Sequence, residues 1–155
     1  VPFFLLGGTA LGLGRGEQLT PLQFSPDFWI VLICPGFPVS TAWAYNQSKI
    51  GLTNVDKISK LRALFSKTKV HTWCKKLDNE LESVVFQRHP ILKDIKEQLY
   101  QKGAFYASMS GSGSSIYGLF SEKKHAEAVK KFFHMKKMQA YLCRPVSTNP
   151  FDQLV

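Results

Sequence analysis

The feature that most restricts the fold of this chain is an unbroken apolar run at residues 28–34, FWIVLIC. The run is rich in aromatic and β-branched residues, and a short run of this kind is typical of a strand in the interior of a sheet. Pro35 and Gly36 follow directly and mark its end. We therefore predict a strand over residues 28–34 that is buried on both faces.

Helical patterns follow this strand. Ser40 is a suitable N-cap for a short helix over residues 41–48. Residues 77–102 carry Leu, Val and Ile at helical spacing, but a proline inside a helix costs about 3 kcal/mol. We therefore predict two helices there, the second of which begins near Pro90. Residues 122–135 form a further predicted helix, with apolar side chains inward and lysines outward.

Three further strands complete the pattern. Residues 104–109 and 115–120 flank a stretch of glycine and serine, and residues 139–146 form the last predicted strand. From residue 28 onward the order is strand, helices, strand, strand, helix, strand. This order predicts an α+β fold, a ferredoxin-like sandwich with a four-stranded antiparallel sheet and helices on one face.

The residues before this sandwich form short apolar runs interrupted by glycines. Residues 3–6 and 9–13 resemble short extended runs, and glycines at 12, 14 and 16 alternate with larger residues. Glycine at every second position of a strand predicts a bend, or a close approach of another group to the bare face. Residues 25–27, with Pro26 between Ser25 and Asp27, form a plausible boundary.

The first residues also suggest a division into domains. The chain begins with an apolar segment and no Met, so we expect a piece of a longer protein. We assign residues 1–25 to the remnant of a preceding domain and residues 26–155 to the sandwich. Because an exposed apolar strand edge pairs readily with another copy, residues 3–6 predict a possible homo-oligomer.

Composition excludes several classes. The 155 residues include 20 Lys and Arg against 11 Asp and Glu, and no apolar run reaches the roughly 18 residues that a membrane helix needs. The three cysteines and four histidines form no close cluster, so we predict neither a disulfide framework nor a metal site, and we expect a reducing cytoplasm. Lysines opposite an apolar helix face indicate a solvated surface, which makes nucleic acid an unlikely partner.

The Gly/Ser loop, residues 110–115 (SGSGSS), is the sharpest local feature. Small residues allow backbone N–H groups to converge, and such a nest favours a phosphate or diphosphate. The loop is not a P-loop, because no Lys follows its second glycine. The simpler interpretation is a hairpin turn between two strands. On the first interpretation, the phosphate-loop candidates are Gly111, Ser112 and Gly113.

A second candidate pair lies in the predicted helix at residues 41–48. Thr41 and Tyr45 are four residues apart, so they share a helix face. A hydroxyl group and an aromatic ring on one face can bind a flat base by hydrogen bonding and stacking. The alternative is that Ser40 or Thr41 caps the helix and Tyr45 packs in the core.

Together these segments resemble a known family. Residues 1–17, 35–45, 79–82 and 109–115 occur in an order that is similar to the C-terminal part of the GHMP kinase superfamily. The closest resemblance is to its branch that acts on a cytidine-diphosphate-linked methylerythritol in isoprenoid biosynthesis. The resemblance implies an ATP-dependent transfer of a phosphoryl group to an alcohol, with Mg²⁺, in the cytoplasm.

The resemblance also implies roles for individual residues. It places Gly111, Ser112 and Gly113 near the phosphates, Tyr45 against the cytosine ring and Thr41 in contact with the cytidine. The catalytic Asp and Lys of the family would lie upstream of Val1, so no catalytic residue is assigned in this chain. We therefore expect the 155-residue chain to require the N-terminal kinase domain and to be inactive alone.

Two other functions remain open at this point. The first is another GHMP kinase, such as one that acts on mevalonate or homoserine. The second is a stand-alone ferredoxin-like module that binds anions or RNA. The second would bind oligonucleotides with an affinity that falls steeply as salt rises.

Overall fold

The computed structural model describes residues 8–22, 27–48 and 77–146. These residues fall into two compact units, one containing the chain up to Asp27 and the other beginning at Phe28. Each unit is considered by itself. The predicted division into residues 1–25 and 26–155 stays a prediction, and the apolar residues 3–6 lie outside the described residues.

The described part of the first unit is a β-hairpin. Strand β1 (Ala10–Leu13) pairs antiparallel with β2 (Gln18–Pro21). The chain changes direction at the alternating glycines, but as a hairpin turn and not as a bend within one strand, because β1 ends at Leu13 and Gly14 and Gly16 lie in the turn. Gly14 and Gly16 have φ of +64° and +91°, and the Gly16 N–H donates to the Leu13 carbonyl at 3.0 Å. Glycine adopts such angles without steric cost.

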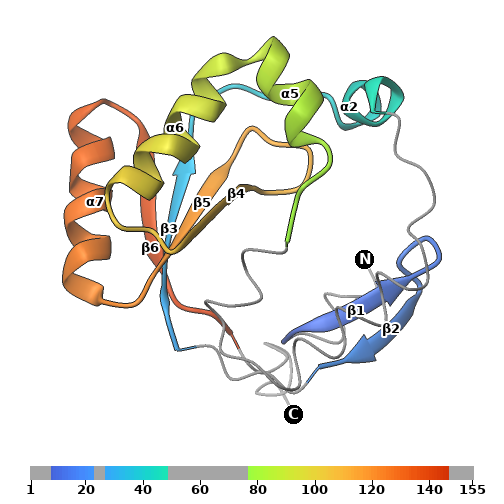
Figure 1. Cartoon of the computed structure of the whole chain (residues 1–155), viewed down its shortest axis with the longest axis horizontal. Coiled ribbons are helices and arrows are strands. Elements are labelled where there is room, and N and C mark those ends of the chain that lie inside the picture. The colour runs from blue at the N-terminus through green and yellow to red at the C-terminus, as the bar shows by residue number, and fades with distance from the viewer. Residues whose placement is uncertain (1–7, 23–26, 49–76, 147–155) are drawn as a thin grey trace. The chain divides into compact units, whose positions relative to one another are not determined.

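The second unit contains the predicted sandwich (Figure 1). Its sheet has the order β4-β5-β3-β6, and every neighbouring pair is antiparallel. The strands are β3 (Trp29–Cys34), β4 (Tyr106–Met109), β5 (Ile116–Phe120) and β6 (Gln139–Cys143). The helices are α2 (Thr41–Gln47), α5 (Glu82–Arg88), α6 (Pro90–Gln101) and α7 (Lys123–Met135). This arrangement confirms the ferredoxin-like prediction.

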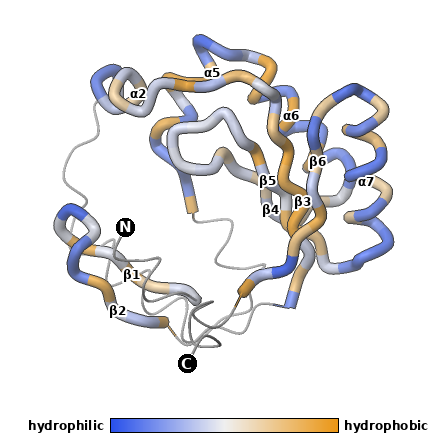
Figure 2. Tube along the Cα trace, turned by 180° about the vertical axis from the view of Figure 1, so that it is seen from behind, coloured by the Kyte–Doolittle hydropathy of each residue, from blue (hydrophilic) through white to orange (hydrophobic). Residues whose placement is uncertain are grey.

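The core lies between one face of the sheet and the helices. Val31 and Ile33 of β3 are fully buried, and they belong to one cluster with residues of α5, α6 and α7. In Figure 2 strand β3 is largely hydrophobic, whereas α7 is largely hydrophilic. The helix therefore turns its few apolar residues inward and presents its lysines to solvent, as the sequence predicts.

The prediction that residues 28–34 are buried on both faces is wrong. Val31 and Ile33 are fully buried, but Ile30 and Leu32 are only half-buried. The reason is that helices α5, α6 and α7 pack on the face of Val31 and Ile33. An antiparallel sheet covered in this way buries alternate residues more completely than their neighbours.

The helices after β3 begin and end for identifiable reasons. Pro90 is the first residue of α6, which confirms the predicted division of residues 77–102. Gly103, with φ of +90°, follows the end of α6. The first helix of the pair begins later than predicted, at Glu82, and residues 77–81 have another role. No helix among the described residues is long and apolar enough to cross a bilayer.

Candidate functional site

The Gly/Ser loop joins β4 to β5 and closes on itself. The Ser110 N–H donates to the Ser115 carbonyl at 2.8 Å, and the Gly113 N–H donates to the Ser110 carbonyl at 2.9 Å. Gly111 and Gly113 have φ of +56° and +89°, angles that strain any residue with a side chain. The loop therefore has one defined backbone path, which two of its glycines make possible.

Gly113 is required by the space around it as well as by its backbone angle. A Cβ atom at this position would lie 2.8 Å from Met109 Sδ and 3.7 Å from Val39 Cγ2. Met109 is buried in the core, so its sulfur has little freedom to move away. A side chain at residue 113 would therefore disturb both the loop and the core beneath it.

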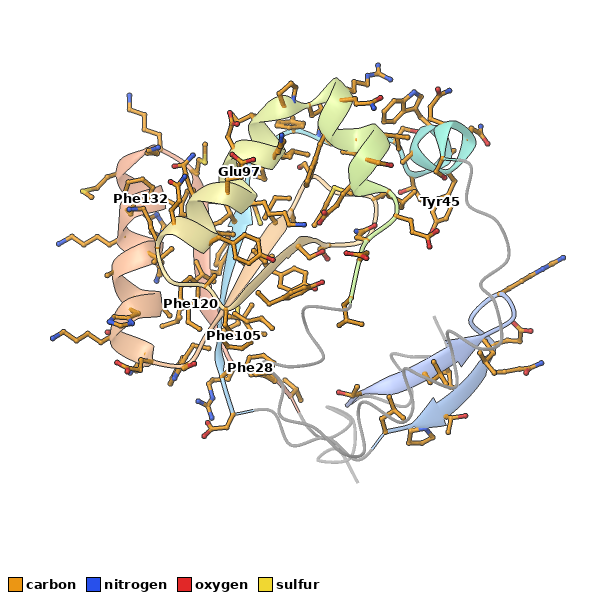
Figure 3. All side chains as sticks on the ribbon, viewed as in Figure 1. Phe28, Tyr45, Glu97, Phe105, Phe120 and Phe132 are labelled. Atoms are coloured by element: carbon orange, nitrogen blue, oxygen red, sulfur yellow. The ribbon has the colours of Figure 1, made fainter. Side chains whose placement is uncertain are left out.

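Helix α2 presents the second pair of candidates. The Ser40 hydroxyl accepts a hydrogen bond from the Trp43 N–H at 3.3 Å, which confirms Ser40 as the N-cap. Thr41 and Tyr45 lie on an exposed face of the helix, and 56% of the Tyr45 side chain is accessible (Figure 3). The alternative in which Tyr45 packs in the core is therefore wrong.

The loop and α2 meet through a hydrogen bond between two hydroxyl groups. Thr41 Oγ1 lies 2.8 Å from Ser112 Oγ, although the residues are 71 positions apart. The Ser114 hydroxyl adds a second link, because it donates to the Phe37 carbonyl just before α2. The structure therefore brings Thr41 to the loop, and Tyr45 lies one helical turn further along the same face.

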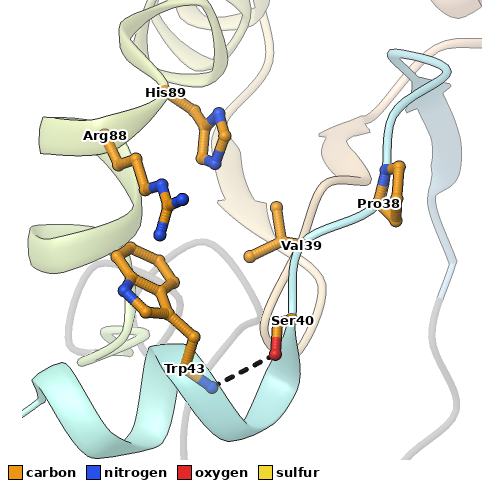
Figure 4. Close-up of a pocket in the computed structure, with 6 residues that line it drawn as sticks. All are labelled: Pro38, Val39, Ser40, Trp43, Arg88 and His89. Atoms are coloured by element: carbon orange, nitrogen blue, oxygen red, sulfur yellow. Dashed lines mark hydrogen bonds between the residues drawn. The ribbon is translucent and has the colours of Figure 1, made fainter.

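On its opposite side, α2 packs against residues at the end of α5. The Arg88 guanidinium lies 4.5 Å from the centre of the Trp43 ring, and the His89 ring meets the same indole edge-on at 6.5 Å. These side chains surround a cavity of about 530 Å³ (Figure 4). Its lining consists of Pro38, Val39, Ser40, Trp43, Arg88 and His89. Helix α2 therefore packs through Trp43 on this side, and the face that carries Thr41 and Tyr45 stays exposed.

Residues 77–81 also contact the loop, which their apolar spacing does not reveal. The Asn79 side-chain amide donates to the Met109 and Gly111 carbonyls at 2.9 and 2.8 Å. The sequence does contain a signal for this arrangement. Asn79 followed three residues later by Glu82 is a helix-start pattern. The Leu81 N–H donates to Asn79 Oδ1 at 3.1 Å.

Glu82 supports the strand that leads into the loop. Its carboxylate accepts from the Met109 N–H at 2.8 Å and from the Ser108 hydroxyl at 2.9 Å. Its second oxygen pairs with Lys96 Nζ at 2.5 Å, and both side chains are mostly buried. Hydrogen bonds to a charged group are the stronger kind, so Glu82 fixes the end of β4 firmly.

The arrangement is suited to anion binding more than to metal binding. The loop contains backbone N–H groups, such as those of Gly111 and Ser112, and a nest binds phosphate oxygens through groups of this kind. Within residues 8–22, 27–48 and 77–146, no three His, Cys, Asp or Glu side chains are grouped so that they could hold a metal ion. Phosphate binding by the loop therefore stays a prediction at this point.

Comparison with known proteins places this geometry in a family. The family model described as GHMP kinases C terminal matches residues 61–137. A relative from Pelobacter propionicus named 4-diphosphocytidyl-2-C-methyl-D-erythritol kinase is 43% identical over 130 residues, which cover 84% of this chain and 45% of the relative. The chain belongs to the GHMP kinases. This confirms the resemblance that its sequence segments indicate.

Solved GHMP kinase structures show the same fold. A 4-(cytidine 5'-diphospho)-2C-methyl-D-erythritol kinase superposes with a TM-score of 0.64 at 26% identity, covering 86% of this chain and 48% of that one. A homoserine kinase from Cytophaga hutchinsonii superposes with a TM-score of 0.59 at 20% identity, covering 93% of this chain and 50% of that one. The chain thus spans about half the length of the GHMP kinases that it matches.

Proposed function

We propose that this chain is the substrate-side, C-terminal part of a kinase that phosphorylates 4-diphosphocytidyl-2-C-methyl-D-erythritol in non-mevalonate isoprenoid biosynthesis. The observation that carries the proposal is the hydrogen bond between Thr41 and Ser112, because it joins a base-binding helix face to a phosphate-binding loop. A cytidine diphosphate contains both groups. Relatives at 43% identity bear this kinase's name, whereas the homoserine kinase at 20% identity shares the fold alone.

Each candidate residue has a distinct part in the proposal. Gly111, Ser112 and Gly113 lie against the phosphates, where the Gly111 and Ser112 N–H groups bind phosphate oxygens while the Gly113 N–H closes the loop on the Ser110 carbonyl. The exposed Tyr45 ring stacks on the cytosine, and the Thr41 hydroxyl hydrogen-bonds to the cytidine. These contacts position the substrate, and positioning supplies much of the rate acceleration in phosphoryl transfer.

ATP and Mg²⁺ belong to the proposal as the phosphoryl donor and its metal. The described residues do not fit a protein-bound Mg²⁺, because they contain no cluster of three metal-ligating side chains. We therefore assign no step through Mg²⁺ to this part of the protein. The remaining catalytic groups, an Asp and a Lys, are expected from an N-terminal kinase domain, and inactivity of the chain alone stays a prediction. We also propose that the protein acts in the cytoplasm.

Replacing Tyr45 by alanine tests the base-binding role. Loss of aromatic stacking costs about 1–3 kcal/mol per base, so the affinity of the chain for cytidine 5′-diphosphate should fall by a factor between about 5 and about 150. The affinity for inorganic diphosphate should not change, because that ligand has no base. Isothermal titration calorimetry with both ligands makes the comparison.

The matched control is Tyr141→Ala, which removes another exposed tyrosine, 49% accessible, from strand β6. This variant should bind both ligands as the unaltered chain does. An equal loss of cytidine 5′-diphosphate affinity in the two variants, or no loss in Tyr45→Ala, would contradict the proposed base site.

A further inference from the structure

Every polar atom of the Asn79 side-chain amide is engaged. A primary amide has two N–H donors, and the two acceptors of Asn79 Nδ2 are the carbonyls of Met109 and Gly111. The amide oxygen accepts from the Leu81 N–H. Three backbone groups therefore fix the orientation of this side chain, and the side chain in turn holds two points of the chain around the Gly/Ser loop.

The first of the two carbonyls, that of Met109, lies at the edge of the described sheet. Strand β4 is an edge strand, whose only neighbour in the described sheet is β5. The Met109 carbonyl accepts from Asn79, and the Met109 N–H donates to Glu82. Two side chains thus satisfy backbone groups that a further strand would otherwise satisfy, and they fix the direction in which the chain leaves β4.

The second carbonyl, that of Gly111, determines the direction in which the Ser112 N–H points. In a trans peptide the C=O and the next N–H point in opposite directions. Because Asn79 holds the Gly111 carbonyl toward itself, the Ser112 N–H points away from Asn79. Gly111 has wide backbone freedom, so without this contact the peptide could rotate and turn its carbonyl oxygen toward a bound anion.

We infer that Asn79 is a positioning residue that locks the Gly/Ser loop in the orientation that presents the Ser112 N–H to a phosphate group. The inference rests on the proposed phosphate-binding role of the loop. Asn79 itself touches the loop backbone and donates its hydrogens to carbonyls, so it acts on the ligand through the loop.

The variant Asn79→Asp tests this inference with little change of shape. A carboxylate can still accept from the Leu81 N–H, but it cannot donate to the two carbonyls. We expect hydrogen exchange at the Gly113 amide, which donates within the loop, to accelerate about tenfold. The affinity for inorganic diphosphate should fall about tenfold, and exchange at the core residues Val31 and Ile33 should not change.

The control is Asn46→Asp, the same substitution at an exposed position of α2. It adds the same charge without touching the loop, so it should change neither measurement by more than about twofold. A second variant, Asn79→Ser, replaces the two amide N–H donors by one hydroxyl on a shorter side chain, which cannot bridge both carbonyls, and it adds no charge. It should reproduce the faster exchange and the weaker diphosphate binding.

The outcomes separate this inference from the proposed function. Unchanged exchange at Gly113 in Asn79→Asp and Asn79→Ser would overturn the role of Asn79. Weaker binding in Asn46→Asp to the same degree as in Asn79→Asp would also overturn it, because charge alone would then explain the loss. If the unaltered chain does not bind diphosphate, the phosphate role of the loop is wrong, and the exchange at Gly113 still decides whether Asn79 holds the loop.

Discussion

Replacing Gly113 by alanine should lower the free energy of unfolding by about 3 kcal/mol and abolish diphosphate binding. A residue with a side chain at φ of +89° is strained by about 1–3 kcal/mol. The new methyl group would also meet Met109 Sδ at 2.8 Å, and extra volume in a packed core costs a further 1–3 kcal/mol or so. Urea unfolding followed by circular dichroism measures the change.

The control for this prediction is Gly103→Ala. Gly103 has nearly the same backbone angle, φ of +90°, but a Cβ atom there would meet no other atom within 4 Å. The Gly103→Ala variant should therefore be destabilised only by the backbone strain, about 1–2 kcal/mol, and should bind diphosphate as the unaltered chain does. Equal destabilisation in the two variants would show that the contact with Met109 has no effect.

Replacing Phe133 by alanine should lower the free energy of unfolding by about 3–5 kcal/mol, the usual cost of deleting a large aromatic side chain from a core. Phe133 is fully buried in the cluster between α7 and the sheet. Domains of this size are stable by only about 5–15 kcal/mol, so the variant would be close to unfolding at 37 °C. Denaturant titration at 25 °C gives the value.

The adjacent residue provides the comparison. Phe132 is half-buried, and the ammonium groups of Lys102 and Lys136 lie 3.6 and 4.6 Å from the centre of its ring. Phe132→Ala should cost only about 1–2 kcal/mol, from partial burial and the loss of cation–π contacts at the surface. A larger loss in Phe132→Ala than in Phe133→Ala would contradict the orientation of α7 on the sheet.

Much of the fold follows from local signals in the sequence. Ser40 and Pro90 mark helix starts because capping and the fixed φ of proline act on neighbouring residues. The order of strands and helices then leaves few sheet topologies. The apolar run at residues 28–34 does not report how completely each face is covered, since that depends on where distant helices pack.

The candidate site could be predicted only in part. The composition of the Gly/Ser loop and the spacing of Thr41 and Tyr45 indicate ligand-binding residue types. The contact between Thr41 and Ser112 is a tertiary contact across 71 positions, and no local pattern contains it. Residues 79–82 belong to the segments that resemble the family, but the contact of Asn79 with the loop was not predicted, because the leucines at 77 and 81 continue a helical apolar spacing.

The measurement that most directly tests the central claim is a ¹⁵N NMR titration of the chain with cytidine 5′-diphosphate. We expect the backbone signals of Thr41 and Tyr45 to shift together with those of Gly111, Ser112 and Gly113, with one common dissociation constant, because one ligand spans the helix face and the loop. Shifts confined to the lysine-rich surface of α7, or no saturable shift at α2 and the loop, would contradict the claim that these two elements form one substrate site.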